Sequence, residues 1–174
     1  MTAPARGLLI RTLPLVLLLA GLAEGTPAAA PSRKPNVDPQ LGPFVHAQVM
    51  RAARRFGSPA CALVLEDFPD ERTGRRLAES LTAYGQTANE YLGSLAYRLG
   101  PAAGPCDNPQ IDAYTSPGSR TIFICREQFL RRQRSSEGFA ANILIHETLH
   151  SLGLGENPPT PSEITARVDA RCGR

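Results

Sequence analysis

Apolar residues recur along most of the chain with the spacing of amphipathic helices. The clearest case is the segment 44–56, where they return every three or four positions until Gly57 ends the pattern. Its apolar positions are Phe44, Val45, Val49, Ala52, Ala53 and Phe56. Similar runs predict further helices over 60–66, 75–84, 87–99, 127–134 and 139–152. The pattern therefore predicts a mainly helical fold.

One stretch departs from helical spacing. Ile111–Thr115 and Arg120–Cys125 are short runs of β-prone residues, and the turn sequence Ser116-Pro117-Gly118-Ser119 separates them. They predict a β-hairpin just before the last helices, and hence a single small α+β domain. Arg120–Cys125 is the candidate edge strand beside a substrate cleft, because an extended peptide can add to an exposed sheet edge. The alternative is an ordinary two-stranded ribbon that covers the core.

The first thirty residues have the composition of a secretory signal peptide. Arg6 and Arg11 give a positive start, an apolar run follows over 13–22, and Ala28-Ala29-Ala30 offers a cleavage site. The apolar run is short for a membrane span, and a retained N-terminal anchor is the alternative. We expect three parts, namely a signal peptide over 1–30, a flexible Pro-rich arm over 31–43 and the folded domain over 44–174.

Net charge and cysteine content indicate what this domain can bind and whether it contains disulfides. The formal net charge of +3 is too small to indicate a nucleic-acid partner. The four cysteines form no C-x-x-C pair, which disfavours a cysteine zinc site, and their even number in an exported chain predicts two disulfides. Four cysteines allow three pairings, and the sequence does not choose among them. We expect Cys106–Cys125, which would close the hairpin segment, and Cys61–Cys172, which would tie the last helix to the body.

The motif with the strongest chemical implication lies in the segment 139–152. His146-Glu147-Thr148-Leu149-His150 reads H-E-x-x-H, so a helix places both imidazoles on one face, one turn apart. Two such imidazoles can bind one metal ion, and Glu147 lies near enough to act on water at the metal without being a ligand. The alternative, two polar residues on the solvent side of a helix, explains the polarity but not the spacing. The third histidine, His46, is expected to be a surface or partly buried residue.

The residues after the motif extend it. Gly153 follows His150 by three positions and Glu156 follows it by six. A glycine allows the left-handed turn that ends a helix and sends the chain back toward the metal. The string resembles the H-E-x-x-H-x-x-G-x-x-H pattern of the metzincin metalloproteases, with Glu156 in place of the third histidine. The resemblance implies a Zn²⁺ ion held by His146, His150 and Glu156.

The chain departs from that family in one respect. Metzincins carry a methionine in a turn beneath the metal, whereas Met1 and Met50 both lie upstream of the motif. The domain is therefore similar to a minimal zincin rather than to a full metzincin. The whole chain also resembles small exported bacterial proteins of unknown function that end in an H-E-x-x-H-x-L-G-L-G-E-N-P-P run.

Glu163 is the alternative third ligand, because other zincins take a glutamate from a second helix. However, Thr160-Pro161-Ser162-Glu163 also fits a capping box at the start of a helix, and that role alone accounts for a glutamate there. We favour Glu156, because it occupies the loop position of the metzincin ligand.

The expected function is an exported zinc-dependent metallopeptidase that hydrolyses peptide bonds with Glu147 as the general base. Its partner would be a peptide or protein substrate, with no nucleic acid and no membrane span after signal cleavage. Tyr114 in the hairpin is a candidate to assist the oxyanion or to pack against the motif helix. Two alternatives remain: a zinc-binding interaction or structural domain, and a zinc hydrolase of a non-peptide amide. Glu147 favours an enzyme over a structural site, which has no use for it.

Overall fold

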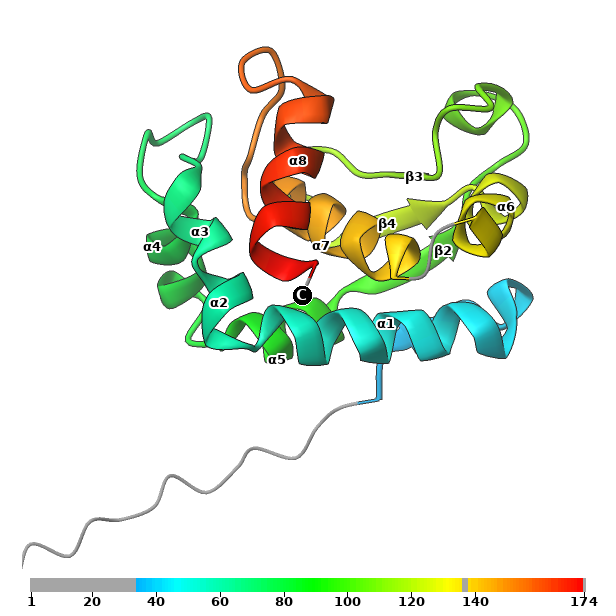
Figure 1. The fold of residues 1–174 in the computed structure, drawn as a ribbon, viewed down its shortest axis with the longest axis horizontal. Coiled ribbons are helices and arrows are strands. Elements are labelled where there is room, and N and C mark those ends of the chain that lie inside the picture. Colours follow the sequence, from blue (N-terminus) through cyan, green and yellow to red (C-terminus); the bar gives the residue numbers. More distant parts are fainter. Residues whose placement is uncertain (1–33, 136–137, 174) are drawn as a thin grey trace, which may run out of the picture. The chain divides into compact units, whose positions relative to one another are not determined.

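The computed structural model describes residues 34–135 and 138–173, so the predicted signal peptide over 1–30 lies outside the described residues. The described chain has an α+β fold in which helices pack on one side of a small sheet (Figure 1). This confirms the predicted fold class. The helices are α1 (Gly42–Phe56), α2 (Pro59–Ala62), α3 (Val64–Asp67), α4 (Leu77–Ala83), α5 (Ala88–Ser94), α6 (Arg126–Ser135), α7 (Phe139–Ser151) and α8 (Pro161–Cys172).

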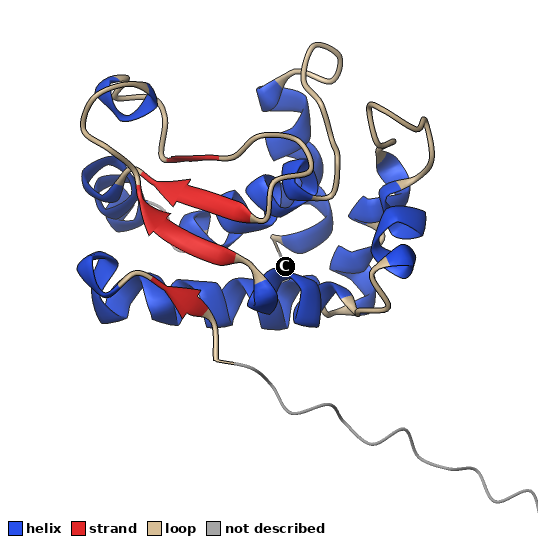
Figure 2. Ribbon diagram, turned by 180° about the vertical axis from the view of Figure 1, so that it is seen from behind, coloured by secondary structure: helices blue, strands red, loops and turns tan. Residues whose placement is uncertain are grey.

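The sheet is mixed, and its strands lie in front of the helices in the view of Figure 2. The strands, in spatial order, are β1 (Asn36–Val37), β2 (Ala96–Leu99), β4 (Thr121–Ile124) and β3 (Ala113–Tyr114). β2 pairs in parallel with both β1 and β4, while β3 pairs antiparallel with β4. Tyr97 pairs with Ile122, and both are fully buried on the face that meets the helices.

α7 is the central helix of the fold. It contacts α1, α6 and α8 as well as β3 and β4. Its apolar residues Ala140, Leu144, Ile145 and Leu149 are buried around much of its circumference. Because neighbours cover α7 on several sides, its polar residues are also removed from solvent. The H-E-x-x-H motif is on this helix, so the solvent-side alternative for the two histidines is wrong.

The predicted hairpin is present, but the edge of the sheet is not where the sequence pattern placed it. β3 and β4 pair in register Ala113 with Ile124 and Tyr114 with Phe123. β4 is bordered by β2 on its other side, so Arg120–Cys125 is an interior strand. The edge strand is β3. The sequence did not predict the position of this edge, because the parallel partner of β4 lies in a segment whose apolar spacing predicts a helix.

That segment is the second difference from prediction. The apolar spacing over 87–99 predicted one helix, but α5 ends at Ser94 and the chain becomes extended at Leu95 (ψ 156°). Ala96–Leu99 then forms β2. Pairing with β4 buries Tyr97, whose hydroxyl donates to the Leu92 carbonyl at 2.8 Å. Tertiary pairing therefore overrides a local helical pattern.

Two further segments differ from their predicted structure. The flexible arm predicted over 31–43 is wrong from Asn36 onward, because β1 pairs with β2 and a 3₁₀ turn at Pro39–Leu41 places Leu41 in the core. The helix predicted over 60–66 is instead two short helices, α2 and α3, which meet at Leu63.

Both expected disulfides are formed. Cys61 is joined to Cys172 and Cys106 is joined to Cys125. The first ties α2 to the end of α8, and the second ties the loop before β3 to the end of β4. Two disulfides indicate an oxidising environment outside the cytosol. Within the described residues, no helix has the length and apolarity needed to cross a membrane.

Candidate metal centre

Three polar side chains of the motif lie inside the protein. His146, Glu147 and His150 are only 6%, 7% and 4% exposed. His146 and His150 are one turn apart on α7, so their rings lie on the same face of the helix. Their Nε2 atoms are 3.1 Å apart.

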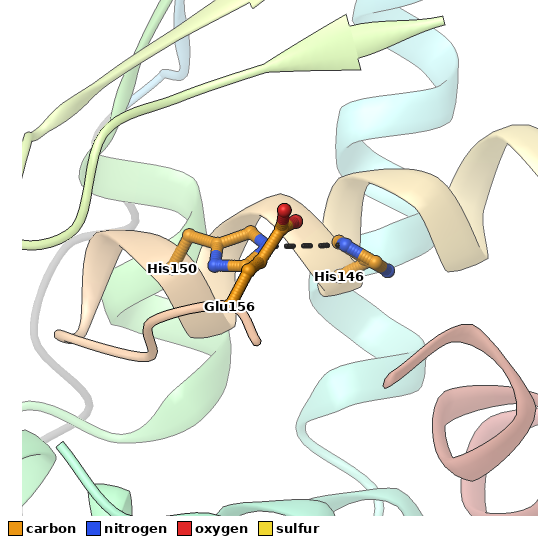
Figure 3. Close-up of side chains that lie close together, drawn as sticks. All are labelled: His146, His150 and Glu156. Atoms are coloured by element: carbon orange, nitrogen blue, oxygen red, sulfur yellow. Dashed lines mark hydrogen bonds and ion pairs between the residues drawn. The ribbon is translucent and has the colours of Figure 1, made fainter. Parts of the chain in front are cut away.

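Glu156 completes a three-residue cluster with these histidines. Its Oε1 lies 3.2 Å from the Nε2 atom of His150. One potential ligand atom from each of His146, His150 and Glu156 lies within 4.8 Å of the other two. Figure 3 shows the two rings on α7 and the Glu156 side chain, which comes from the loop after the helix and crosses in front of the His150 ring.

The turn at Gly153 brings Glu156 to this position. The Gly153 N–H donates to the His150 carbonyl at 2.8 Å, and the Leu154 N–H donates to the Leu149 carbonyl at 3.1 Å. These two bonds form a Schellman motif, and Gly153 has the positive φ of 115° that such a cap needs. Leu154 is buried and anchors the turn. The expectation that Gly153 redirects the chain is confirmed.

The outer nitrogen of each ring has its own partner. The Nδ1 atom of His150 lies 2.8 Å from the carbonyl oxygen of Leu154. The Nδ1 atom of His146 lies 3.1 Å from the hydroxyl of Thr165 on α8. Partners of this kind orient an imidazole so that its other nitrogen faces a metal. Burial, with a contribution from His150, lowers the pKa of His146 to about 3, so this ring is neutral at pH 7.

These three residues could hold a metal ion. For ligand bonds of about 2.0–2.1 Å, neighbouring ligand atoms in a tetrahedral site lie roughly 3.3 Å apart. The observed separations of 3.1 Å and 3.2 Å match this value. Glu156 is the exposed member of the cluster, so its side chain can adjust to an ion with little cost. All four cysteines are in disulfides and are therefore not ligands.

The cluster opens into a cleft of about 530 Å³. One wall is the face of α7 that carries Phe139, Ile143, His146, Glu147 and His150, and the opposite wall is the segment 110–115, which includes β3. Thr165 and Pro161 of α8 close one side. The edge strand, rather than the predicted β4, therefore borders the candidate site.

Glu147 lies in this cleft beside the cluster. Its carboxylate accepts a hydrogen bond from the backbone N–H of Thr115, just after β3. Burial raises the pKa of Glu147 to about 8; the negative charges of Glu156 and Asp112 add to this rise, and the Thr115 hydrogen bond opposes it. Asp112 is itself buried in the same wall and pairs with Arg132 at 3.2 Å.

Glu163, the alternative ligand, is not part of the cluster. Its carboxylate accepts hydrogen bonds from the backbone N–H of Thr160 at 2.7 Å and from the Thr160 hydroxyl at 2.8 Å. This is the capping box at the start of α8. The structure therefore brings Glu156 to the histidines and gives Glu163 its predicted structural role.

Two other candidates lie away from the ligand atoms. The ring of Tyr114 stacks on Phe123 with centroids 5.1 Å apart, on the sheet face opposite the buried Ile122 and Ile124. The ring therefore does not pack against α7 as one of its two expected roles required, whereas Tyr114 does line the cleft, so its role toward an oxyanion stays a prediction. His46 is exposed on α1 and is not a member of the cluster.

The sequence did not predict the residues of other segments that contact or influence the side chains of the site. Thr165 lies on α8, whereas Asp112 and the Thr115 backbone lie on either side of β3, and none of them belongs to a short motif. The capping box at Thr160 was a signal for α8, but it does not tell which face of α8 meets α7. Only the packing of the two helices brings Thr165 to His146.

No protein-family model, no curated protein and no solved structure matches this chain. The chemistry proposed below therefore depends on the residues and their geometry.

Proposed function

We propose that this protein is an exported zinc-dependent metallopeptidase. One observation carries the proposal: His146, His150 and Glu156 converge at separations suited to one metal ion, and Glu147 lies beside them in an open cleft. A structural metal site is closed by four protein ligands, whereas a catalytic zinc site has three and leaves one position for water.

The kind of ligand supports zinc as the metal. Two imidazoles and one carboxylate form an established catalytic zinc set, and zinc tolerates mixed nitrogen and oxygen ligands. Both histidines have outer partners that orient them, as is usual for metal-binding imidazoles. When bound, zinc supplies a Lewis acid that activates water and polarises a substrate carbonyl.

Glu147 is assigned the proton transfer. A bound Zn²⁺ would favour the ionised form of its carboxylate, which would then take a proton from the attacking water and deliver it to the amine that leaves. The residue is next to His146 in sequence and lines the same cleft, which supports this role. The Thr115 N–H holds one side of the carboxylate, so the side chain is oriented before substrate binds.

The free edge of β3 is the proposed site for a peptide substrate. The Asp112 carbonyl accepts a hydrogen bond from the Cys125 N–H at 2.9 Å, so it faces β4. Backbone groups alternate along an antiparallel strand, so those of Ala113 face away from β4. An extended peptide can pair with them by strand addition and lie across the cleft. The edge is short, since Pro109 and Pro117 lie on either side of it.

A comparison of Glu147→Gln with the unaltered chain tests this function. Both proteins are loaded with Zn²⁺ and incubated with a diverse peptide library, and new termini are identified by mass spectrometry. We expect cleavage by the unaltered chain and a loss of at least about 10²-fold with Glu147→Gln, at equal zinc content. Glu79→Gln, an exposed glutamate on α4, is the matched control and should cleave normally.

The other outcomes identify the alternatives. Zinc at full occupancy without any cleaved peptide would contradict a peptidase and favour a zinc-binding interaction domain. Cleavage of small non-peptide amides alone would favour the amide hydrolase. Cleavage that persists in Glu147→Gln would remove Glu147 from the mechanism.

A further inference from the structure

The two disulfides differ in their access to solvent. Cys106 is half-buried, and together with Cys125 it lines a second hollow of about 800 Å³ between the end of β2 and the start of α6. Cys61 and Cys172, by contrast, are both buried in the core. The Cys106–Cys125 disulfide is therefore the more accessible of the two to a thiol reductant.

The two disulfides also lie at different ends of their helices. The Cys125 carbonyl accepts the first hydrogen bond of α6, from the Phe129 N–H at 2.9 Å, so Cys125 is the N-cap residue of that helix. The positive end of a helix dipole stabilises a thiolate. Cys172 is instead the last residue of α8, where the dipole is negative. Cys125 is therefore the better leaving group, and a better leaving group makes its disulfide easier to open.

The accessible disulfide fastens a loop that leads to the cleft. This loop lies next to α6 (Figure 1) and begins at Gly100, whose N–H donates to the Ile124 carbonyl at 2.9 Å. It ends at Asp112, whose carbonyl accepts from the Cys125 N–H at 2.9 Å. In the part of the chain that the structure describes, the backbone-to-backbone hydrogen bonds between these two points all lie within the loop. Its last residues, 110–112, belong to the cleft wall opposite α7.

Side chains of α6 make the remaining hydrogen bonds that hold this loop. Each donates to a backbone carbonyl, and the pairs are Gln128 with Cys106 at 2.6 Å, Arg131 with Pro109 at 3.2 Å and Arg132 with Gln110 at 3.1 Å. Residues 107–110 are exposed, and hydrogen bonds at the surface compete with water, so each contributes little. The disulfide therefore determines how firmly the cleft wall is held.

We propose that the Cys106–Cys125 disulfide is a redox switch that controls peptide binding in the cleft. It rests on the peptidase of the proposed function. With the disulfide closed, residues 110–112 and the adjoining edge of β3 are fixed opposite α7, so an extended peptide meets a preformed site. With the disulfide open, a peptide must first order this wall, which weakens its binding. The metal ligands are on α7 and the loop after it, so the metal site is retained in both states.

Opening is a thiol–disulfide exchange with a small thiol such as glutathione. A glutathione thiolate attacks the Cys106 sulfur, the bond between the two cysteine sulfurs breaks, and its electron pair leaves on Cys125. A second glutathione thiolate attacks the glutathione sulfur of this mixed disulfide, and Cys106 leaves as a thiolate. Overall, two glutathione thiols become one glutathione disulfide, and the two cysteines become thiols. The reverse steps close the switch, so peptides are bound firmly only in oxidising surroundings.

Titration of the full chain with mixtures of glutathione and glutathione disulfide tests the opening step. Free thiols are alkylated at each ratio and located by mass spectrometry. We expect Cys106 and Cys125 to be alkylated at ratios at which Cys61 and Cys172 are still joined. Opening of the Cys61–Cys172 disulfide first, or of both disulfides together, would contradict the proposal.

Peptide cleavage by the unaltered chain and by Cys106→Ser/Cys125→Ser tests the consequence. The double variant represents the open state and is loaded with Zn²⁺ without thiols, which bind the metal. We expect its KM to rise by about 10-fold or more, with kcat and Zn²⁺ affinity within about 3-fold of the unaltered chain. The matched control is Cys61→Ser/Cys172→Ser, whose KM should still rise when glutathione opens its remaining disulfide. An unchanged KM in Cys106→Ser/Cys125→Ser would overturn the switch.

Hydrogen exchange gives a readout that needs neither a variant nor activity. When glutathione opens Cys106–Cys125 in the unaltered chain, amides of 101–112 should exchange faster, and those of α7 should not change. Unchanged exchange over 101–112 would overturn the inference. If the oxidised chain binds no zinc or cleaves no peptide, the proposed function is wrong, and the exchange still decides whether the disulfide holds the wall. If it cleaves peptides with the same KM in both states, only this inference is wrong.

Discussion

Gly153 and Asp70 are in such close contact that a Cβ atom on residue 153 would lie 2.6 Å from Oδ2 of Asp70. Asp70 is buried, and its other oxygen accepts from the backbone N–H groups of Arg72 and Thr73 at 2.8 Å and 3.1 Å. The Glu71 N–H donates to the Gly153 carbonyl at 2.9 Å. The loop after α3 thus supports the turn that carries Glu156, although it is some eighty residues away in sequence.

The first prediction concerns Gly153→Ala. A φ of 115° costs a residue with a side chain about 1–3 kcal/mol, and the contact with Asp70 adds to this cost. We expect lower unfolding free energy in urea and weaker Zn²⁺ binding, because the turn no longer places Glu156. Gly93→Ala in α5 is the control: nothing lies within 4 Å of its added Cβ, so a gain of about 0.5–1 kcal/mol is expected. Equal effects of the two variants would contradict this account.

The charge of Asp70 leads to a prediction about pH. Burial opposes ionisation, but the hydrogen bonds from Arg72 and Thr73 outweigh it and hold the pKa of Asp70 below its usual value. A carboxylate with a lowered folded-state pKa stabilises the fold above its unfolded pKa of about 3.9, and this contribution is lost as the pH falls through the folded pKa. Asp70→Asn keeps the accepting oxygen and removes the charge. Urea unfolding should show a higher free energy of unfolding for the unaltered chain than for Asp70→Asn at pH 7, and this difference should shrink on acidification. A difference that does not change with pH would contradict a lowered pKa of Asp70.

The third metal ligand can be identified with two alanine variants. Glu156→Ala removes the carboxylate 3.2 Å from His150 and should release zinc. Glu163→Ala removes the capping box of α8, so it should lower Tm modestly while zinc affinity is retained. Titration with Zn²⁺ and thermal unfolding of the metal-free proteins separate the two effects. Zinc loss in Glu163→Ala alone would reverse the assignment.

The two disulfides should differ in their contribution to stability. Cys61–Cys172 spans 111 residues and Cys106–Cys125 spans 19. In the chain-entropy description, removing the disulfide that closes the longer loop lowers the free energy of unfolding by roughly 4–5 kcal/mol. Removing the disulfide that closes the shorter loop lowers it by about 3 kcal/mol. Guanidinium unfolding of the two double serine variants, without reductant, measures the difference. A larger loss from the shorter loop would show that local strain or packing, rather than loop length, decides the stability.

Local signals predicted the parts of the fold that are determined locally. The apolar spacing of 44–56 and the capping box at Thr160 correctly predicted α1 and α8, and the turn at Ser116–Ser119 correctly predicted the hairpin. β2 was missed because Leu95 and Leu99 continue the helical spacing of α5, although Gly93 lies just before the break at Ser94. Only the distant partner β4 makes this segment a strand.

In the candidate site, too, the sequence predicted what local geometry determines but not what depends on tertiary contacts. His146, His150, Glu156 and Gly153 lie within eleven consecutive positions, so helix geometry and one turn were enough to predict that they converge. Thr165, Thr115 and Asp70 act on this cluster from α8, the hairpin and the loop after α3. Their roles depend on tertiary contacts for which the sequence contains no local pattern.

The zinc content of the purified full chain tests the central claim most directly. After incubation with Zn²⁺ and desalting, elemental analysis should find about one zinc ion per chain, and little or none in His146→Ala and His150→Ala. His46→Ala, which alters the exposed third histidine on α1, should retain the full amount. Zinc retained at the same level in His146→Ala and His150→Ala, or absent from the unaltered chain, would contradict the metal centre.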